Sequence, residues 1–235
     1  MRILLISNSG RPFLEHCKAW IFQFLGPARR VAFVTAANLY DEAAYYERAR
    51  EALEGPRPAG ADLKLLHLRW DAHPVVTLEQ AEAIFMGGGN TYALLKRLRE
   101  AGLLEPIRAC VRAGMPYIGS SAGSNVAGPN VLTTNDWNVV GLTTFEALGL
   151  VPFNINPHYL ETDPAMAPGS ETRDERIQEY HVVWKNPVLG IEEGTLVRVE
   201  EGVVSVLGTR RVKVFRRDQE PRWYGAGDRL EPGPD

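Results

Sequence analysis

One segment combines a strand, a tight turn and a helix start in the pattern needed for nucleophilic chemistry. Residues 115–119 are typical of a buried strand, and Gly119-Ser120-Ser121-Ala122-Gly123 follows directly. Glycines on both sides of such a turn permit a conformation in which side chains would clash, and the turn lifts the Ser121 hydroxyl above the sheet edge. The N–H of Ala122 then points to where an oxyanion would form. The segment indicates a nucleophile elbow; a turn that only connects, or that binds phosphate, is the alternative.

A second glycine loop, Gly87-Gly88-Gly89-Asn90-Thr91, ends another apolar run and opens a helix. Its glycines let the backbone approach a ligand closely, so the N–H groups of Gly88 and Gly89 are candidates for the other half of an oxyanion hole. A dinucleotide phosphate loop is less favoured, because Tyr92 stands where the third glycine of that motif is required.

Among the five histidines, His158 has the position expected of a general base. It follows the short apolar run 153–157, and a parallel-sheet enzyme places its polar groups just after its strands. The other histidines have structural explanations in helices, beside a strand or in a loop: His16, His67, His73 and His181. His158 is therefore the predicted base for Ser121.

A carboxylate must hold the imidazole in the correct tautomer, and two residues are candidates. Asp136 would give the chain order Ser, Asp, His, whereas Glu193 would give Ser, His, Glu. Both lie in pairs that are common in turns, and spacing alone does not choose between them.

The elements that must position these residues follow an α/β pattern. Short, continuous apolar runs alternate with amphipathic stretches, which predicts a three-layer α/β/α sandwich with a mostly parallel, flavodoxin-like sheet. The predicted strands are 3–6, 31–35, 63–68, 84–86 and 117–119, and the predicted helices are 13–25, 42–53, 92–101 and 104–113. The β-rich runs after residue 186 predict a C-terminal meander that closes the sheet. We expect a single domain over residues 1–217 and a loosely attached polar tail over 218–235.

Composition narrows the class of protein. The chain has 235 residues and a net charge of −3, which fits one domain and lacks the basic excess required for nucleic-acid binding. Two cysteines far apart suit a reducing compartment, and the N-terminal apolar run is too short for a signal peptide or membrane span. We therefore expect a cytoplasmic protein that binds neither nucleic acid nor membrane.

The chain resembles the aspartyl dipeptidase (peptidase E) family, serine peptidases with the fold of class I glutamine amidotransferases. The resemblance runs nearly end to end. It rests on seven ordered motifs: 4–9 (LLISNS), 87–91 (GGGNT), 119–123 (GSSAG), 133–136 (TTND), 155–158 (INPH), 171–177 (ETRDERI) and 190–194 (GIEEG).

The resemblance implies hydrolysis of dipeptides that begin with aspartate, without metal or cofactor. The moderate apolar fraction of the chain is compatible with a monomer or a homodimer. It assigns Ser121 as nucleophile, His158 as base and Glu193 as acid, with Asp136 as the other acid proposed for that role. Arg173 is expected to bind the aspartate side chain with Asn90 and Glu171 nearby, and Glu171 or Asp136 is expected to meet the substrate amine.

The residues themselves add one argument for Arg173. Thr172 and Glu175 have capping-box spacing, which places Arg173 in the first turn of a helix, where the dipole disfavours a cation. A ligand carboxylate that binds Arg173 would explain why a cation stands at this unfavourable position. The alternative is that Arg173 is a solvated surface arginine.

Two other functions remain open: a cyanophycinase-like hydrolase that cuts bonds beside aspartate, and a non-catalytic module that binds a small molecule. The sequence also departs from the family pattern, because Ser120 and Ser124 stand where we expect an aromatic residue and alanine. We expect both serines to line the mouth of the substrate pocket.

Overall fold

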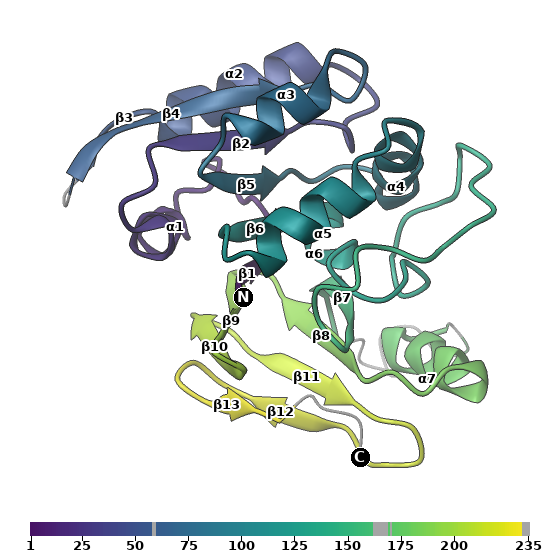
Figure 1. The fold of residues 1–235 in the computed structure, drawn as a ribbon. Helices are drawn as coiled ribbons and strands as arrows, with labels where there is room; N and C mark the ends of the chain where they lie inside the picture. Colours follow the sequence, from purple (N-terminus) through teal and green to yellow (C-terminus); the bar gives the residue numbers. More distant parts are fainter. Residues whose placement is uncertain (58–59, 162–168, 170, 232–235) are drawn as a thin grey trace.

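Five parallel strands form the centre of the larger sheet. The computed structural model describes residues 1–57, 60–161, 169 and 171–231 (Figure 1). The parallel strands lie in the order β1-β6-β5-β2-β4. Their bounds are β1 (Arg2–Ile6), β2 (Arg30–Val34), β4 (Gly60–Leu68), β5 (Ala83–Met86) and β6 (Tyr117–Ser120). These strands agree with the five predicted from apolar runs, within a few residues at each end.

Two cores cover the two faces of this sheet, because successive side chains of a strand point to opposite sides. Ile3 and Leu5 lie in one core, with residues of α3, α4 and α5, whereas Leu4 and Ile6 lie in the other, with residues of α1 and α2. The helices are α1 (Lys18–Leu25), α2 (Glu42–Leu53), α3 (Pro74–Glu79), α4 (Thr91–Glu100) and α5 (Leu104–Arg112). This arrangement explains why the strands read as continuous apolar runs.

Side chains cap the first turns of two of these five helices. Asp41 and Asn90 accept hydrogen bonds from backbone N–H groups in the first turns of α2 and α4. Helix α1 has no side-chain cap, and it begins at Lys18 rather than at Phe13 as predicted. Leu14 has a φ of 58°, which is incompatible with a continuous α-helix.

A second, smaller sheet corrects the expected meander. It contains β7 (Asn154–Tyr159), β8 (Val188–Glu192), β11 (Val212–Phe215) and β12 (Arg222–Tyr224), in the order β12-β11-β8-β7. The other late strands extend the larger sheet beyond β1: β9 (Thr195–Glu200), β10 (Val203–Gly208) and β13 (Arg229–Leu230). The short β3 (Gly55–Arg57) pairs antiparallel with β4 at the opposite edge. The chain therefore passes between sheets where β8 ends and β9 begins, at Glu193 and Gly194.

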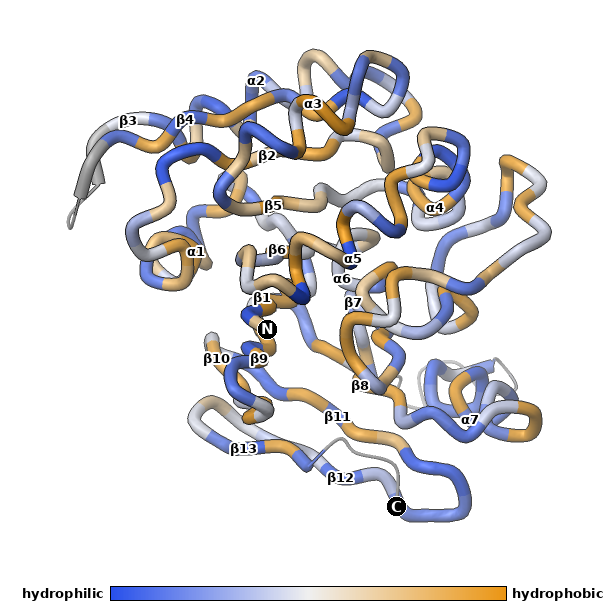
Figure 2. The backbone as a smooth tube through the Cα atoms, in the orientation of Figure 1, coloured by the Kyte–Doolittle hydropathy of each residue, from blue (hydrophilic) through white to orange (hydrophobic). Residues whose placement is uncertain are grey.

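The expectation of a loosely attached tail is wrong for the described residues 218–231. β12 pairs with β11, and β13 pairs with β10. Leu230 is buried in the core of the larger sheet, and Trp223 packs against the core under the smaller one. These apolar contacts hold the segment in place, although its Pro and Gly content suggested otherwise. Figure 2 shows apolar residues along β8 and β11, whereas the turn after β11 is hydrophilic. Residues 232–235 of the expected tail lie outside the described residues.

The strand order places the polar loops together. β4-β2-β5-β6 follows the flavodoxin-like order, and β1 completes the parallel set beside β6. The carboxyl ends of β1, β5 and β6 are neighbours, so the loops beginning at Ser7, Gly87 and Ser121 gather at one edge. In the described part of the chain, no helix has both the length and the apolar character needed to cross a lipid bilayer.

Candidate active site

Ser121 lies at the turn between β6 and the short helix α6 (Ala122–Asn125). Its φ is 53°, a left-handed conformation that is costly for a residue with a side chain. A Cβ on Gly119 would lie 2.4 Å from the Gly123 carbonyl oxygen, and a Cβ on Gly123 would lie 2.0 Å from that of Met86. Only glycine fits at either position, so the structure has the strand, turn and helix geometry expected of a nucleophile elbow.

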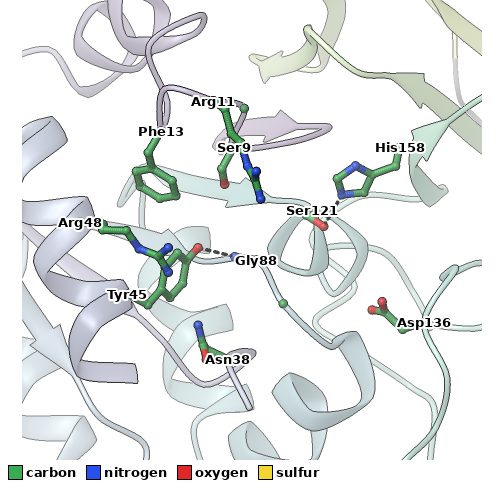
Figure 3. Close-up of a pocket in the computed structure, with 12 residues that line it drawn as sticks. Ser9, Arg11, Phe13, Asn38, Tyr45, Arg48, Gly88, Ser121, Asp136 and His158 are labelled. Carbon is green, nitrogen blue, oxygen red and sulfur yellow. Dashed lines mark hydrogen bonds between the residues drawn. The ribbon is translucent and has the colours of Figure 1, made fainter. Parts of the chain in front are cut away.

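His158 faces Ser121 from the smaller sheet. The pairing of β7 with β8 shifts register between Pro157 and Tyr159, and His158 at this bulge has a φ of 54°. A bulge re-aims a side chain out of the strand ladder. His158 Nε2 lies 2.8 Å from Ser121 Oγ, which is hydrogen-bond distance (Figure 3).

Glu193 completes a chain of hydrogen bonds from the link between β8 and β9. Its Oε1 lies 2.7 Å from Nδ1 of His158, on the side of the ring away from Ser121. The Glu193 side chain is 61% exposed, so this ion pair is open to solvent. The sequence left two candidate acids, Asp136 and Glu193. Glu193 is the one that contacts the imidazole of His158.

Asp136, the other candidate acid, also lies near Ser121 but does not contact the imidazole of His158. Its Oδ2 accepts hydrogen bonds from the backbone N–H of Thr91 at 2.7 Å and from Thr134 Oγ1 at 3.2 Å. Asp136 is thus held at the start of α4, and its carboxylate bonds to described residues other than His158. Its Oδ1 receives no hydrogen bond from a described residue.

The residues just after β1 hold the segments that carry His158 and Glu193. The Ser7 hydroxyl accepts a hydrogen bond from the His158 backbone N–H at 2.9 Å and donates to the carbonyl of Ile191 at 2.8 Å. The side-chain oxygen of Asn8 accepts from the Gly194 N–H at 3.0 Å. These buried or half-buried bonds fix both segments relative to the central strand.

The two N–H groups of the glycine loop after β5 differ in whether they are available to an oxyanion. The N–H of Gly88 donates to the Tyr45 hydroxyl at 2.8 Å, so it is already engaged. Burial raises the pKa of Tyr45, which keeps this hydroxyl neutral. Within the described residues, the N–H groups of Gly89 and Ala122 have no hydrogen-bond acceptor. Of the three predicted donors, Gly89 and Ala122 are therefore the two left free beside Ser121.

A cavity of about 600 Å³ opens beside Ser121. This volume lies in the range of small-ligand sites. Figure 3 shows its lining residues, which come from the loops after β1, β2 and β5, from α2, from the turn after β6, from the segment after α6 and from β7. The residues are Ser9, Gly10, Arg11, Phe13, Asn38, Tyr45, Arg48, Gly88, Gly89, Ser121, Asp136 and His158.

A second cavity, of about 400 Å³, lies on the other side of His158. It contains Arg173 and Arg210 beside His158 and Glu193. Arg173 opens α7 (Arg173–Val183), and Thr172 and Glu175 form the predicted capping box. Burial lowers the pKa of the Arg173 guanidinium, and the nearby Arg176 lowers it further. The predicted place of Arg173 in a first helical turn is confirmed, and the residue lines this second cavity.

Asn90 and Glu171 line neither cavity. The Asn90 amide caps α4 through Oδ1 and donates from Nδ2 to the carbonyl of Trp137 at 2.9 Å, so helix capping occupies it. Glu171 is mostly exposed and pairs with Arg176 at 3.3 Å. The structure thus does not bring these two predicted substrate-binding residues to Ser121.

Ser120 and Ser124 are also absent from the mouth of the pocket, because both are fully buried. Ser124 Oγ accepts from the Ile6 N–H at 3.0 Å, and Ser120 Oγ lies 3.0 Å from Ser9 Oγ. Both hydroxyls join the elbow to the end of β1. The expectation that they line the mouth is wrong, since each fills a buried polar position.

Sequence reasoning missed the cavity residues on α2 and in the loop after β1. Tyr45 and Arg48 lie on a helix whose pattern reads only as amphipathic, so no local signal marks them. Arg11 follows the LLISNS motif just past a predicted strand, where parallel-sheet proteins bind their ligands. This position was the only sequence signal for a cavity residue in that loop.

The cysteines do not compete with Ser121. Burial raises the pKa of the Cys17 thiol to about 12 and also raises the pKa of Cys110. Both stay protonated near neutral pH, and a thiol is a poor nucleophile compared with a thiolate. In the described residues, no three side chains of His, Cys, Asp or Glu converge as a metal site would require.

Comparison with known proteins identifies the family. Residues 3–207 match peptidase family S51. The chain belongs to this family. It is 44% identical over 233 residues to "Peptidase E" of Streptomyces coelicolor, a match covering 98% of this chain and 93% of that protein.

Two further comparisons concern a second relative and the fold. The chain is 44% identical over 222 residues to "Probable alpha-aspartyl dipeptidase" of Drosophila melanogaster, covering 92% of this chain and 90% of that protein. The crystal structure of a peptidase from an acI-B1 actinobacterium superposes with a TM-score of 0.70 at 17% identity, covering 97% and 96% of the two chains. The predicted family and the predicted α/β fold class are both confirmed.

The Ser121, His158 and Glu193 arrangement predicts selective reaction with a serine-directed fluorophosphonate. Ser121→Ala should abolish labelling. Glu193→Gln should slow labelling at least about tenfold, because the imidazole loses its charged partner, whereas Asp136→Asn should leave the rate within about twofold. Mass spectrometry of the labelled chain measures both site and rate. Slower labelling in Asp136→Asn with an unchanged rate in Glu193→Gln would assign the acid to Asp136 instead.

Proposed function

We propose that this S51 chain is a serine peptidase that hydrolyses dipeptides with an N-terminal aspartate. The observation that carries the proposal is the continuous chain of hydrogen bonds from Ser121 through His158 to Glu193. Two backbone N–H groups of the same site, those of Gly89 and Ala122, have no acceptor among the described residues. Relatives that are named peptidase E and alpha-aspartyl dipeptidase align with nearly the whole chain, and they support dipeptides with an N-terminal aspartate as the substrate class. A non-catalytic binding module would have no need of this arrangement.

The chemistry follows from the geometry. Ser121 Oγ attacks the peptide carbonyl carbon while His158 Nε2 accepts its proton, and Glu193 stabilises the resulting imidazolium at Nδ1. The carbonyl oxygen becomes an oxyanion that accepts hydrogen bonds from Gly89 and Ala122. Each such donor contributes about 100- to 1,000-fold in rate. His158 then gives its proton to the departing amine, and water hydrolyses the aspartyl ester on Ser121.

Charged residues in the two cavities that meet at His158 match the charges of an N-terminal aspartate. Arg173 binds the side-chain carboxylate, since a guanidinium fork donates two parallel hydrogen bonds to a carboxylate. Asp136 binds the substrate amino group, because it lines the cavity beside Ser121 and its Oδ1 accepts no hydrogen bond from a described residue. Glu171 was the other candidate for the amine, and its exposed position beside Arg176 disfavours it.

We also propose that the protein is cytoplasmic. A small peptide substrate is the only partner that the chemistry requires. Two unpaired cysteines suit a reducing compartment. Every step above uses a group of this chain, with no metal or cofactor.

Release of the N-terminal residue from Asp-Leu, Glu-Leu, Asn-Leu, Ala-Leu and a β-linked Asp-Arg peptide tests the function. We expect cleavage of Asp-Leu, little of the others, and none by Ser121→Ala. Cleavage confined to the β-linked peptide would instead support a cyanophycinase-like hydrolase. Full activity in Ser121→Ala would refute the mechanism.

Arg173 should act mainly on the Michaelis constant. Arg173→Ala removes the carboxylate partner, so we expect KM for Asp-Leu to rise about tenfold or more with little change in thermal unfolding. Arg176→Ala is the matched control, because Arg176 lies on the same helix and pairs with the exposed Glu171. Equal KM values for the Arg173 variant and the wild type would remove Arg173 from the site.

Tyr45 should act as a positioning residue for the oxyanion loop. Tyr45→Phe removes the acceptor that holds the Gly88 N–H, so we expect kcat for Asp-Leu to fall about tenfold with KM nearly unchanged. Tyr46→Phe is the control, since the Tyr46 hydroxyl donates to Leu65 and not to the loop. If both variants lowered kcat alike, the effect would be one of helix packing.

A further inference from the structure

Two arginines line the cavity beside Ser121 without an acidic partner. Arg11 lies in the loop after β1 and Arg48 lies on α2, so separate elements deliver the two guanidinium groups. Figure 3 shows Arg11 extending toward Ser121 and Arg48 beside Tyr45, whose ring centroid is 5.8 Å from the Arg48 guanidinium carbon. Neither arginine makes an ion pair with a described carboxylate.

Other arginines of the same region are paired. Arg50, two residues along α2, lies 2.7 Å from a carboxylate oxygen of Glu47, and Arg97 lies 3.2 Å from one of Glu42. Arg11 and Arg48 thus differ from these arginines, because they line a cavity and make no ion pair with a described carboxylate. Two such cations favour an anionic ligand between them and disfavour a neutral or cationic one.

The cavity is also electrically asymmetric about Ser121. Figure 3 shows Asp136 on one side of Ser121 and both arginines on the other. A dipeptide has the same asymmetry: an ammonium at one end and a carboxylate at the other, with a single peptide bond between. When the ammonium meets Asp136 and the carbonyl meets Ser121, the free carboxylate falls on the arginine side.

We propose that Arg11 and Arg48 bind the C-terminal carboxylate of the dipeptide and so restrict the enzyme to substrates of two residues. This inference rests on the proposed function. It assigns each charge of an Asp-X dipeptide to a separate group: the amine to Asp136, the side chain to Arg173 in the second cavity, and the C-terminus to the two arginines. A longer peptide or a C-terminal amide leaves the arginines without a carboxylate.

Binding to Ser121→Ala tests the inference without turnover. Isothermal titration calorimetry would compare Asp-Leu with Asp-Leu amide on Ser121→Ala, alone and combined with Arg11→Gln or Arg48→Gln. We expect the amide to bind at least about tenfold more weakly than Asp-Leu. Each arginine change should weaken Asp-Leu about tenfold and leave the amide unchanged. Arg50→Gln, on the same helix but paired with Glu47, should alter neither.

Three outcomes would overturn the inference: equal binding of Asp-Leu and its amide, equal loss for both peptides in the arginine variants, or no effect of either variant. Equal loss for both peptides would assign the arginines to the aspartate side chain, which Asn-Leu as a third ligand would reveal. Hydrolysis by the wild type is measured separately. If the wild type cleaves neither peptide while the binding pattern holds, the proposed function fails and the carboxylate site stands.

Discussion

The three residues at the end of β1 are the point on which the whole site depends. The carbonyl of Ile6 accepts from the Ser121 N–H, the Ser7 hydroxyl accepts from the His158 N–H, and the Asn8 amide accepts from the Gly194 N–H beside Glu193. Because β1 pairs with both β6 and β9 at the centre of the larger sheet, these bonds share one rigid reference. The nucleophile, the base and the acid are thus set in place before any substrate binds.

Strained backbone accompanies this arrangement. Ser121 and His158 both have left-handed φ angles, 53° and 54°, and such conformations cost of order 1–3 kcal/mol each. The strain persists because the backbone N–H of each residue is held by a hydrogen bond, that of Ser121 to Ile6 at the end of β1 and that of His158 to Ser7 just after it. Its consequence is geometric: the elbow turns Ser121 out of one sheet and the bulge turns His158 out of the other, so their side chains meet.

The sequence by itself determined the features that depend on neighbours along the chain. Continuous apolar runs predicted the central parallel strands, since burial on both faces leaves no room for polar residues. Gly119 and Gly123 predicted the elbow, and Thr172 with Glu175 predicted the start of α7. Each is a matter of steric or hydrogen-bond requirements within a few residues, which spacing records directly.

Tertiary structure alone decided which distant residues meet. Glu193 rather than Asp136 contacts His158, because the chain changes sheets at Glu193. The attachment of the C-terminal strands, the bond from Gly88 to Tyr45 and the two arginines of the cavity were equally hidden. Such contacts join segments tens to nearly two hundred residues apart, as Asn8 and Gly194 illustrate. The local sequence pattern does not predict these contacts, because they form only when the separate cores pack and bring the loops to one edge of the sheet.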